Sequence, residues 1–227
     1  MNKPTDDTAT DVLIREVDED LRQEQMAALW KRYGNWVIGA AVALVAVVAG
    51  REAWIAWKDQ QAARDGSRFA AATLLAETGK AAEAGLAYAA MAKDATGGYA
   101  ALAHLRQAAL LAKDGKNAEA AAAFDALAAD GSADKAYRAA ATLQAALLTL
   151  DSADPSALER RVAPLAAADS PWRHSAQEVL ALLALRQGDR AKARDAYAKL
   201  SDDAQAPRGL RARAAEALAA LGPASKG

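Results

Sequence analysis

The chain contains no cysteine, two histidines and two phenylalanines among its 227 residues. Without cysteine it can form no disulfide bond and offers no thiolate for catalysis or for zinc. His104 and His174 are far apart in the sequence, so no histidine pair has the spacing of metal ligands. The formal net charge of -1 gives no general reason to expect a nucleic acid as partner. We therefore expect no metal site and no nucleic-acid partner.

Catalytic motifs are missing as well. Gly97-Gly98 lacks the lysine and the preceding strand that a phosphate-binding loop requires. Ser175 and Ser201 have no recognisable base arrangement beside them, and serine at a helix cap or on a helix face is the ordinary interpretation. We predict that the protein is not an enzyme, uses no cofactor and takes no small-molecule substrate.

One apolar run, residues 36–50 (WVIGAAVALVAVVAG), lies near the N-terminus and carries no charge. Tryptophan and tyrosine collect at both membrane–water interfaces, because their rings are apolar while their N–H or O–H groups favour water. A helix rises about 27 Å from the first to the last flanking tryptophan around the run, close to a hydrocarbon core of about 30 Å. These features predict a transmembrane helix over residues 34–57, with aromatic anchors at Trp30, Tyr33, Trp36, Trp54 and Trp57.

Two other interpretations of the run stay open. Its uncharged part is short enough for a buried core helix. Val47-Val48-Ala49 before Gly50 is similar to a secretory cleavage site, although the long acidic region before the run favours an uncleaved anchor. The positive-inside rule leaves the orientation undecided, since lysine and arginine are equally frequent within about 15 residues of each end.

Residues 1–33 form a tail ahead of the span. Residues 1–10 are polar and predict disorder. From about Asp11 to Lys31 apolar residues recur at helical spacing with acidic residues on the other faces, which predicts an amphipathic helix. This helix either docks a protein partner or extends the span into solvent.

Residues 67–222 contain an internal repeat. Gly79, Gly115 and Gly188 lie in polar turns that are 36 and then 73 residues apart, which is one period and then two. Between the last two, a degenerate turn is expected near Asp151 to Pro155. Each glycine is followed by alanine after five residues, by an aromatic residue after nine and by a large apolar residue after twelve: Ala84, Tyr88 and Met91; Ala120, Phe124 and Leu127; Ala193, Tyr197 and Leu200.

This pattern predicts an all-α protein. After the N-terminal transmembrane helix and a linker at residues 58–66, about four helical hairpins stack into a solenoid over residues 67–222, because a hairpin alone leaves half its apolar surface exposed. A capping helix is expected at about Pro207 to Leu221, and residues 223–227 form a disordered tail. Glycine, alanine and aromatic residues at these offsets resemble tetratricopeptide repeats.

A second resemblance covers residues 14–50, which are similar to the N-terminus of the YfgM-like family, an ancillary subunit of the Sec translocon. In that family an acidic amphipathic segment leads through a Trp-x-x-Tyr-Gly stretch, here Trp30, Tyr33 and Gly34, into one inner-membrane helix. The resemblance implies a single-pass bacterial inner-membrane protein with a cytoplasmic N-terminus. Its periplasmic repeats would work beside translocon subunits and periplasmic folding factors or chaperones.

The sequence therefore predicts a membrane-anchored scaffold that binds folding factors or client chains. Two alternatives remain: the tail sequesters a cytoplasmic regulator, or the repeats organise envelope or division machinery. The first helix of each hairpin usually lines the concave face of a repeat array. Here these helices are expected at residues 67–77, 99–112, 135–148 and 172–185, and their candidate partner-binding residues are Arg106, Gln107, Arg138, Gln144 and Trp172.

Overall fold

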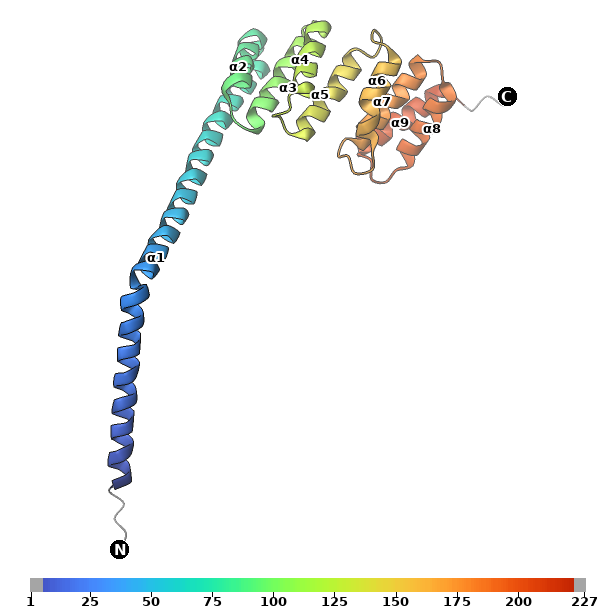
Figure 1. Ribbon diagram of the computed structural model, residues 1–227. Helices are drawn as coiled ribbons and strands as arrows, with labels where there is room; N and C mark the ends of the chain where they lie inside the picture. The colour runs from blue at the N-terminus through green and yellow to red at the C-terminus, as the bar shows by residue number, and fades with distance from the viewer. Residues whose placement is uncertain (1–5, 223–227) are drawn as a thin grey trace. The chain divides into compact units, whose positions relative to one another are not determined.

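The computed structural model describes the backbone of residues 6–222 and the side chains of residues 26, 27 and 29–222. The chain divides into two compact units, residues 1–60 and 61–227, and each is described by itself. The described residues form helices and no strand, which confirms the predicted all-α class (Figure 1). The elements are α1 (Asp6–Glu77), α2 (Ala81–Asp94), α3 (Gly98–Lys113), α4 (Asn117–Ala129), α5 (Lys135–Leu148), α6 (Pro155–Val162), η1 (Ala163–Ala166), α7 (Arg173–Arg186), α8 (Arg190–Asp202) and α9 (Arg208–Leu221).

The second unit is an array of helical hairpins that follow one another in chain order (Figure 1). The end of α1 packs against α2 in one apolar cluster. Helix α3 pairs with α4, α5 with α6 and α7 with α8, while η1 packs against α7 and α9 against α8. The three later first helices, α3, α5 and α7, begin and end within a residue of the predicted ranges. Helix α9 covers the last hairpin as the predicted capping helix.

The glycine turns have the backbone conformation that the repeat requires. Gly79, Gly115 and Gly188 adopt φ values of 83°, 77° and 79°, in the left-handed region that side chains resist. The alanine five residues later is 0% exposed in each of these hairpins. The aromatic and large apolar residues that follow are all buried, so the alternation of small and large side chains forms the core.

The third hairpin has the same two buried positions, but the larger side chain takes the alanine position and the smaller one takes the aromatic position. Asp154 caps α6 by accepting hydrogen bonds from the backbone N–H groups of Ser156 and Ala157, and Pro155 takes the first helical position. Counted from the N-cap, Leu158 occupies the alanine position and Val162 the aromatic position. Both are buried, at 2% and 0% exposure. The larger Leu158 thus compensates for the aromatic residue that is missing at position 162. The sequence pattern did not predict this compensation.

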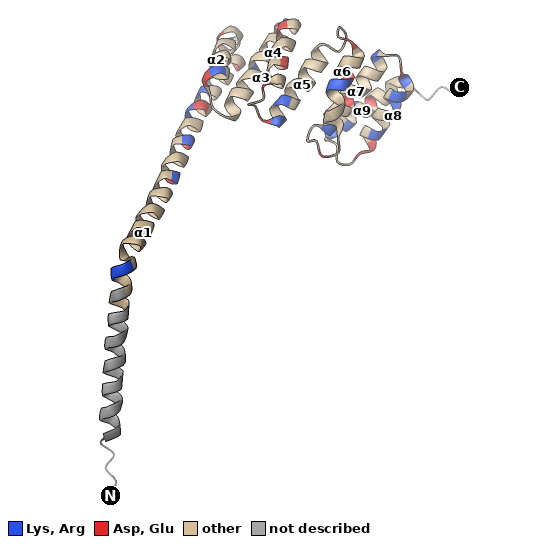
Figure 2. Ribbon diagram, viewed as in Figure 1, with Lys and Arg blue, Asp and Glu red and all other residues tan. Residues whose placement is uncertain are grey.

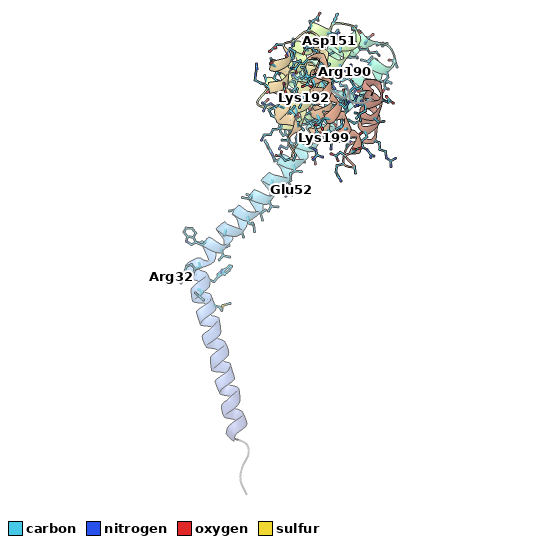
Figure 3. The ribbon with its side chains drawn as sticks, turned by 90° about the vertical axis from the view of Figure 1, so that its right-hand side faces the viewer. Arg32, Glu52, Asp151, Arg190, Lys192 and Lys199 are labelled. Atoms are coloured by element: carbon cyan, nitrogen blue, oxygen red, sulfur yellow. The ribbon has the colours of Figure 1, made fainter. Side chains whose placement is uncertain are left out.

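Ion pairs between residues about one repeat apart join the second helices of neighbouring hairpins. Arg161 of α6 pairs with Asp125 of α4. Lys192 of α8, which is labelled in Figure 3, donates to Glu159 of α6 at 2.8 Å. The hydrogen bond to Glu159 raises the pKa of the Lys192 ammonium group. Because these groups are largely exposed, each pair is expected to stabilise the array only slightly.

The first unit contains the apolar run. Among the described residues, Leu29–Glu77 of α1 is the one helical stretch long and apolar enough to cross a membrane. Figure 2 shows it uncharged between Arg32 and Arg51. The Trp30 ring lies across Gly34, where a Cβ atom would stand 3.2 Å from it, so glycine leaves space for the ring in the Trp-x-x-Tyr-Gly stretch. Residues 58–66, the predicted linker, are helical within α1. The predicted helix from Asp11 to Lys31 is part of α1, and residues 6–10, which were predicted to be disordered, are helical as well. Residues 1–5 and 223–227, also predicted to be disordered, lie outside the described residues.

Substituting Gly115→Ala is expected to lower the free energy of unfolding by about 1 kcal/mol, because alanine is strained at a left-handed φ. Gly131→Ala is the matched control, since Gly131 lies in another turn without a positive φ and with open space around it. Chemical denaturation of both variants measures the difference, and equal stabilities would contradict the role of the turn conformation.

The exchange of sizes in the third hairpin can be tested with a double-mutant cycle. Leu158→Ala alone should cost about 2–5 kcal/mol through the cavity it leaves, and Val162→Phe alone about 1–3 kcal/mol through overpacking. The combined variant restores the small–aromatic pattern of the other hairpins, so it should be more stable than the sum of the two losses predicts. Strict additivity in urea denaturation would show that the two positions do not share one space.

Candidate functional site

A cavity of about 370 Å³ opens between the first helices of the second and third hairpins. Helix α3 supplies one wall and α5 the other, while Phe124 of α4 contributes to the lining. We name it the α3–α5 groove. Its lining is largely aliphatic and consists of Leu102, Leu105, Arg106, Ala109, Ala112, Phe124, Ala140, Gln144 and Leu148. Such a surface accepts apolar side chains and gains free energy by removing them from water.

Two of the predicted site residues, Arg106 and Gln144, line the groove from opposite walls. Both are exposed. Within the described part of the chain, the Arg106 guanidinium has no acidic partner within salt-bridge distance. It therefore keeps its full capacity to bind a carboxylate in a fork geometry. The groove combines apolar walls with one available positive charge and one amide.

The other three predicted residues lie elsewhere. The Arg138 Nε–H donates to the carbonyl oxygen of Ala128 at 3.1 Å, and the Trp172 Nε1–H donates to that of Ala136 at 3.0 Å. These bonds join consecutive helices or hairpins, so both side chains serve the architecture of the array. Gln107 is half-buried and does not line the groove.

Trp172 has counterparts that the sequence reasoning missed. The Tyr99 hydroxyl covers Gly66 so closely that a Cβ atom there would stand 2.8 Å from its oxygen, and Tyr137 covers Gly98 at 3.0 Å in the same sense. In the second, third and fourth hairpins an aromatic residue at the start of the first helix thus contacts the first helix of the preceding hairpin. The available signal was an aromatic residue within two positions of each predicted helix start.

A second cavity, of about 980 Å³, lies at the N-terminal ends of α3 and α5 and includes His104 and Asp130 in its lining. The Asp130 carboxylate accepts hydrogen bonds from the Ser132 hydroxyl at 2.7 Å and from the Ser132 N–H at 2.8 Å. These bonds, the hydroxyl first, lower the pKa of Asp130, and His104 adds a smaller effect. The Asp130 carboxylate thus closes its own turn.

His174, which the sequence placed beside Trp172 and Arg173, belongs to a joint between α7 and the α8–α9 loop. Its Nε2 atom lies 3.0 Å from the Asp203 carboxylate, to which Arg173 also donates at 3.1 Å. The backbone N–H of Gln205 is the largest cause that lowers the pKa of Asp203, followed by the His174 contact. This cluster holds the last hairpin to the capping segment.

Stacked helical hairpins with glycine turns are typical of one family of repeat domains. The model of the tetratricopeptide repeat-like domain matches residues 28–219. The chain belongs to this family. No curated protein and no solved structure matches the chain. As a tetratricopeptide repeat-like protein it is a protein-interaction scaffold. The family match does not test the more specific resemblance to the YfgM-like family, which stays a prediction.

The acid stability of this tetratricopeptide repeat-like domain should depend on Asp203. Its folded-state pKa is lowered, so its stabilising effect is complete above the ordinary carboxyl pKa of 3.8 and is lost as the pH falls through the lower folded value. Asp203→Asn should therefore reduce the thermal unfolding midpoint at pH 7 and flatten its decline below pH 4.

The matched control is Asp202→Asn, the exposed neighbour that does not contact Arg173 or His174. Thermal unfolding followed by circular dichroism between pH 2 and pH 7 gives both curves. Parallel curves for the native chain and Asp203→Asn would contradict the assignment.

Proposed function

We propose that the protein is a membrane-anchored scaffold whose α3–α5 groove binds an apolar segment of a partner protein. The observation that carries the proposal is the groove itself, with aliphatic walls and an uncompensated Arg106. A repeat array presents its first helices as a binding surface, and a partner with an aliphatic side chain near a carboxylate would complement both features.

Anchoring is supported by the apolar stretch of α1. Large apolar side chains such as Trp36, Val42 and Val45 are exposed on it, at 80%, 63% and 67%. So much apolar surface is unfavourable in water and favourable in a hydrocarbon core. The flanking aromatic residues Trp30, Tyr33, Trp54 and Trp57 are also exposed, as anchors at the two interfaces would be.

The cellular setting is proposed from the YfgM-like resemblance of residues 14–50. It places the protein in a bacterial inner membrane, with the N-terminus in the cytoplasm and the repeats in the periplasm beside the Sec translocon. A chain that leaves a translocon exposes apolar segments before it folds, and the α3–α5 groove has the chemistry to hold such a segment. Translocon subunits, periplasmic folding factors and client chains are accordingly the proposed partners.

The role of the α3–α5 groove in binding is tested by placing a large side chain in it. Ala109 is exposed and lines the groove, so Ala109→Arg should block it without disturbing the core. In crosslinking of the full-length chain in a mild detergent, read by mass spectrometry, we expect capture of partner proteins to fall about tenfold, as loss of about 1.4 kcal/mol of binding would give. Ala122→Arg, at an exposed position of α4 outside the groove, should capture partners like the native chain.

Equal capture by both variants would contradict the groove as the binding site. Recovery of neither translocon nor periplasmic folding proteins by the native chain would contradict the proposed partners. Anchoring is tested by alkaline extraction of isolated membranes before detergent is added. The chain should remain in the membrane pellet, and its release would contradict a transmembrane helix.

A further inference from the structure

Arg106 and Gln144 occupy the same position in consecutive hairpins. Arg106 lies seven residues after Tyr99, and Gln144 lies seven residues after Tyr137, where both tyrosines stand at the start of a first helix. Both polar side chains are exposed and line the α3–α5 groove from opposite walls. They therefore form a row that runs across the first helices and not along one of them.

The row ends at Gln144. In the fourth hairpin the same position, seven residues after Trp172, is Val179, which is 2% exposed. Residues of η1 pack against the cluster that contains Val179. In the first hairpin the corresponding residue, counted from the turn glycine, is Ala70, which has only a methyl group. A segment that follows the row thus meets polar groups at two positions, and the site suits a short segment.

The distance across the row sets the spacing of the groups in the bound segment. Helices α3 and α5 are in contact, and the axes of packed helices lie about 8–10 Å apart. An extended chain rises about 3.3 Å per residue, so about three residues cross this distance. A helix, which rises about 1.5 Å per residue, would need about six.

The side chain of Gln144 favours an extended segment. Its amide combines a hydrogen-bond donor and an acceptor, as a peptide group does. The backbone groups in the middle of a helix are already bonded to one another, so a helical segment offers the amide no free peptide group. An extended segment presents such groups along its length, and one of them can pair with Gln144.

The groove carries a single charge. Arg106 is its one charged lining residue, and the others are uncharged and largely aliphatic. A carboxylate in the bound segment would pair with the guanidinium in a fork geometry, whereas an ammonium group would be repelled by it. The groove should therefore distinguish segments of equal hydrophobicity by the sign of their charge.

We infer that the α3–α5 groove recognises a short, extended apolar segment with one acidic side chain, which lies about three residues from the peptide group that Gln144 binds. Arg106 is the residue that determines this specificity. The inference rests on the proposed function, because it names the chemistry of the segment that the groove holds.

Blocked hexapeptides of leucine and alanine test the charge specificity, because capped termini leave a glutamate at the first position as the only charge. In calorimetric titrations of the full-length chain in a mild detergent, with micelles alone as the blank, the glutamate peptide should bind about tenfold more tightly than its lysine counterpart. Arg106→Glu should reverse the preference. Arg160→Glu is the matched control and should keep it, since Arg160 is exposed on α6 outside the groove.

Equal affinities of the two peptides for the native chain, or an unchanged preference in Arg106→Glu, would overturn the inference. Circular dichroism of each variant verifies that the helices are retained. Because Arg106 is exposed, its substitution should leave the fold intact.

The extended conformation is tested by methylating one peptide nitrogen of the glutamate peptide at a time. Methylation about three residues after the glutamate should weaken binding to the native chain about tenfold and should have little effect on binding to Gln144→Ala. The next peptide group should tolerate methylation, because successive groups of an extended chain point to opposite sides. Equal losses at every position, as a helical segment would give, would overturn the extended conformation.

Ala109→Arg separates this inference from the proposed function. If the native chain binds both peptides alike and Ala109→Arg binds neither, the groove holds apolar segments and only the inferred specificity is refuted. If Ala109→Arg binds both peptides like the native chain, the groove is not the binding site, and the proposed function fails together with the inference.

Discussion

The structure depends on how closely alanine lets two helices approach. Ala84, Ala120 and Ala193 are fully buried, and each makes space for an aromatic or large apolar residue of its hairpin. Alanine itself removes little apolar area from water, so an alanine-rich hairpin has a small core. Stability therefore comes from stacking hairpins, because each interface buries the face that the hairpin alone leaves in water.

The same constraint explains where the array varies. In the third hairpin Leu158 and Val162 exchange the small and large positions, and the interior stays filled because their combined volume matters more than their order. It also explains why the two ends differ. Helix α9 covers the last interface, whereas Ser67, Ala71 and Leu74 on the first helix of the array remain exposed.

The α3–α5 groove is a consequence of this packing. The first helices turn their alanine and leucine positions toward neighbouring hairpins, and the residues left over on α3 and α5 form the α3–α5 groove. Polar side chains near it follow the same division. Arg138 and Trp172 are used by backbone carbonyl groups at the joints, whereas Arg106 and Gln144 remain available in the groove.

The sequence by itself determined the helical class, the glycine turns, the buried alanine–aromatic core and, within a residue, the bounds of α3, α5 and α7, because these follow from local spacing and backbone preference. It did not show that the first helix of the array continues without a linker from the apolar run. It also marked Arg106 and Gln144 as groove residues. Only the tertiary structure separated them from Arg138, Trp172 and Gln107, since periodicity gives the face of a helix but not the neighbour that covers it. Two further features depend on contacts about 30 or more residues apart or on packing across a hairpin, which no local pattern records. They are the compensation between Leu158 and Val162 and the aromatic contacts at Gly66 and Gly98.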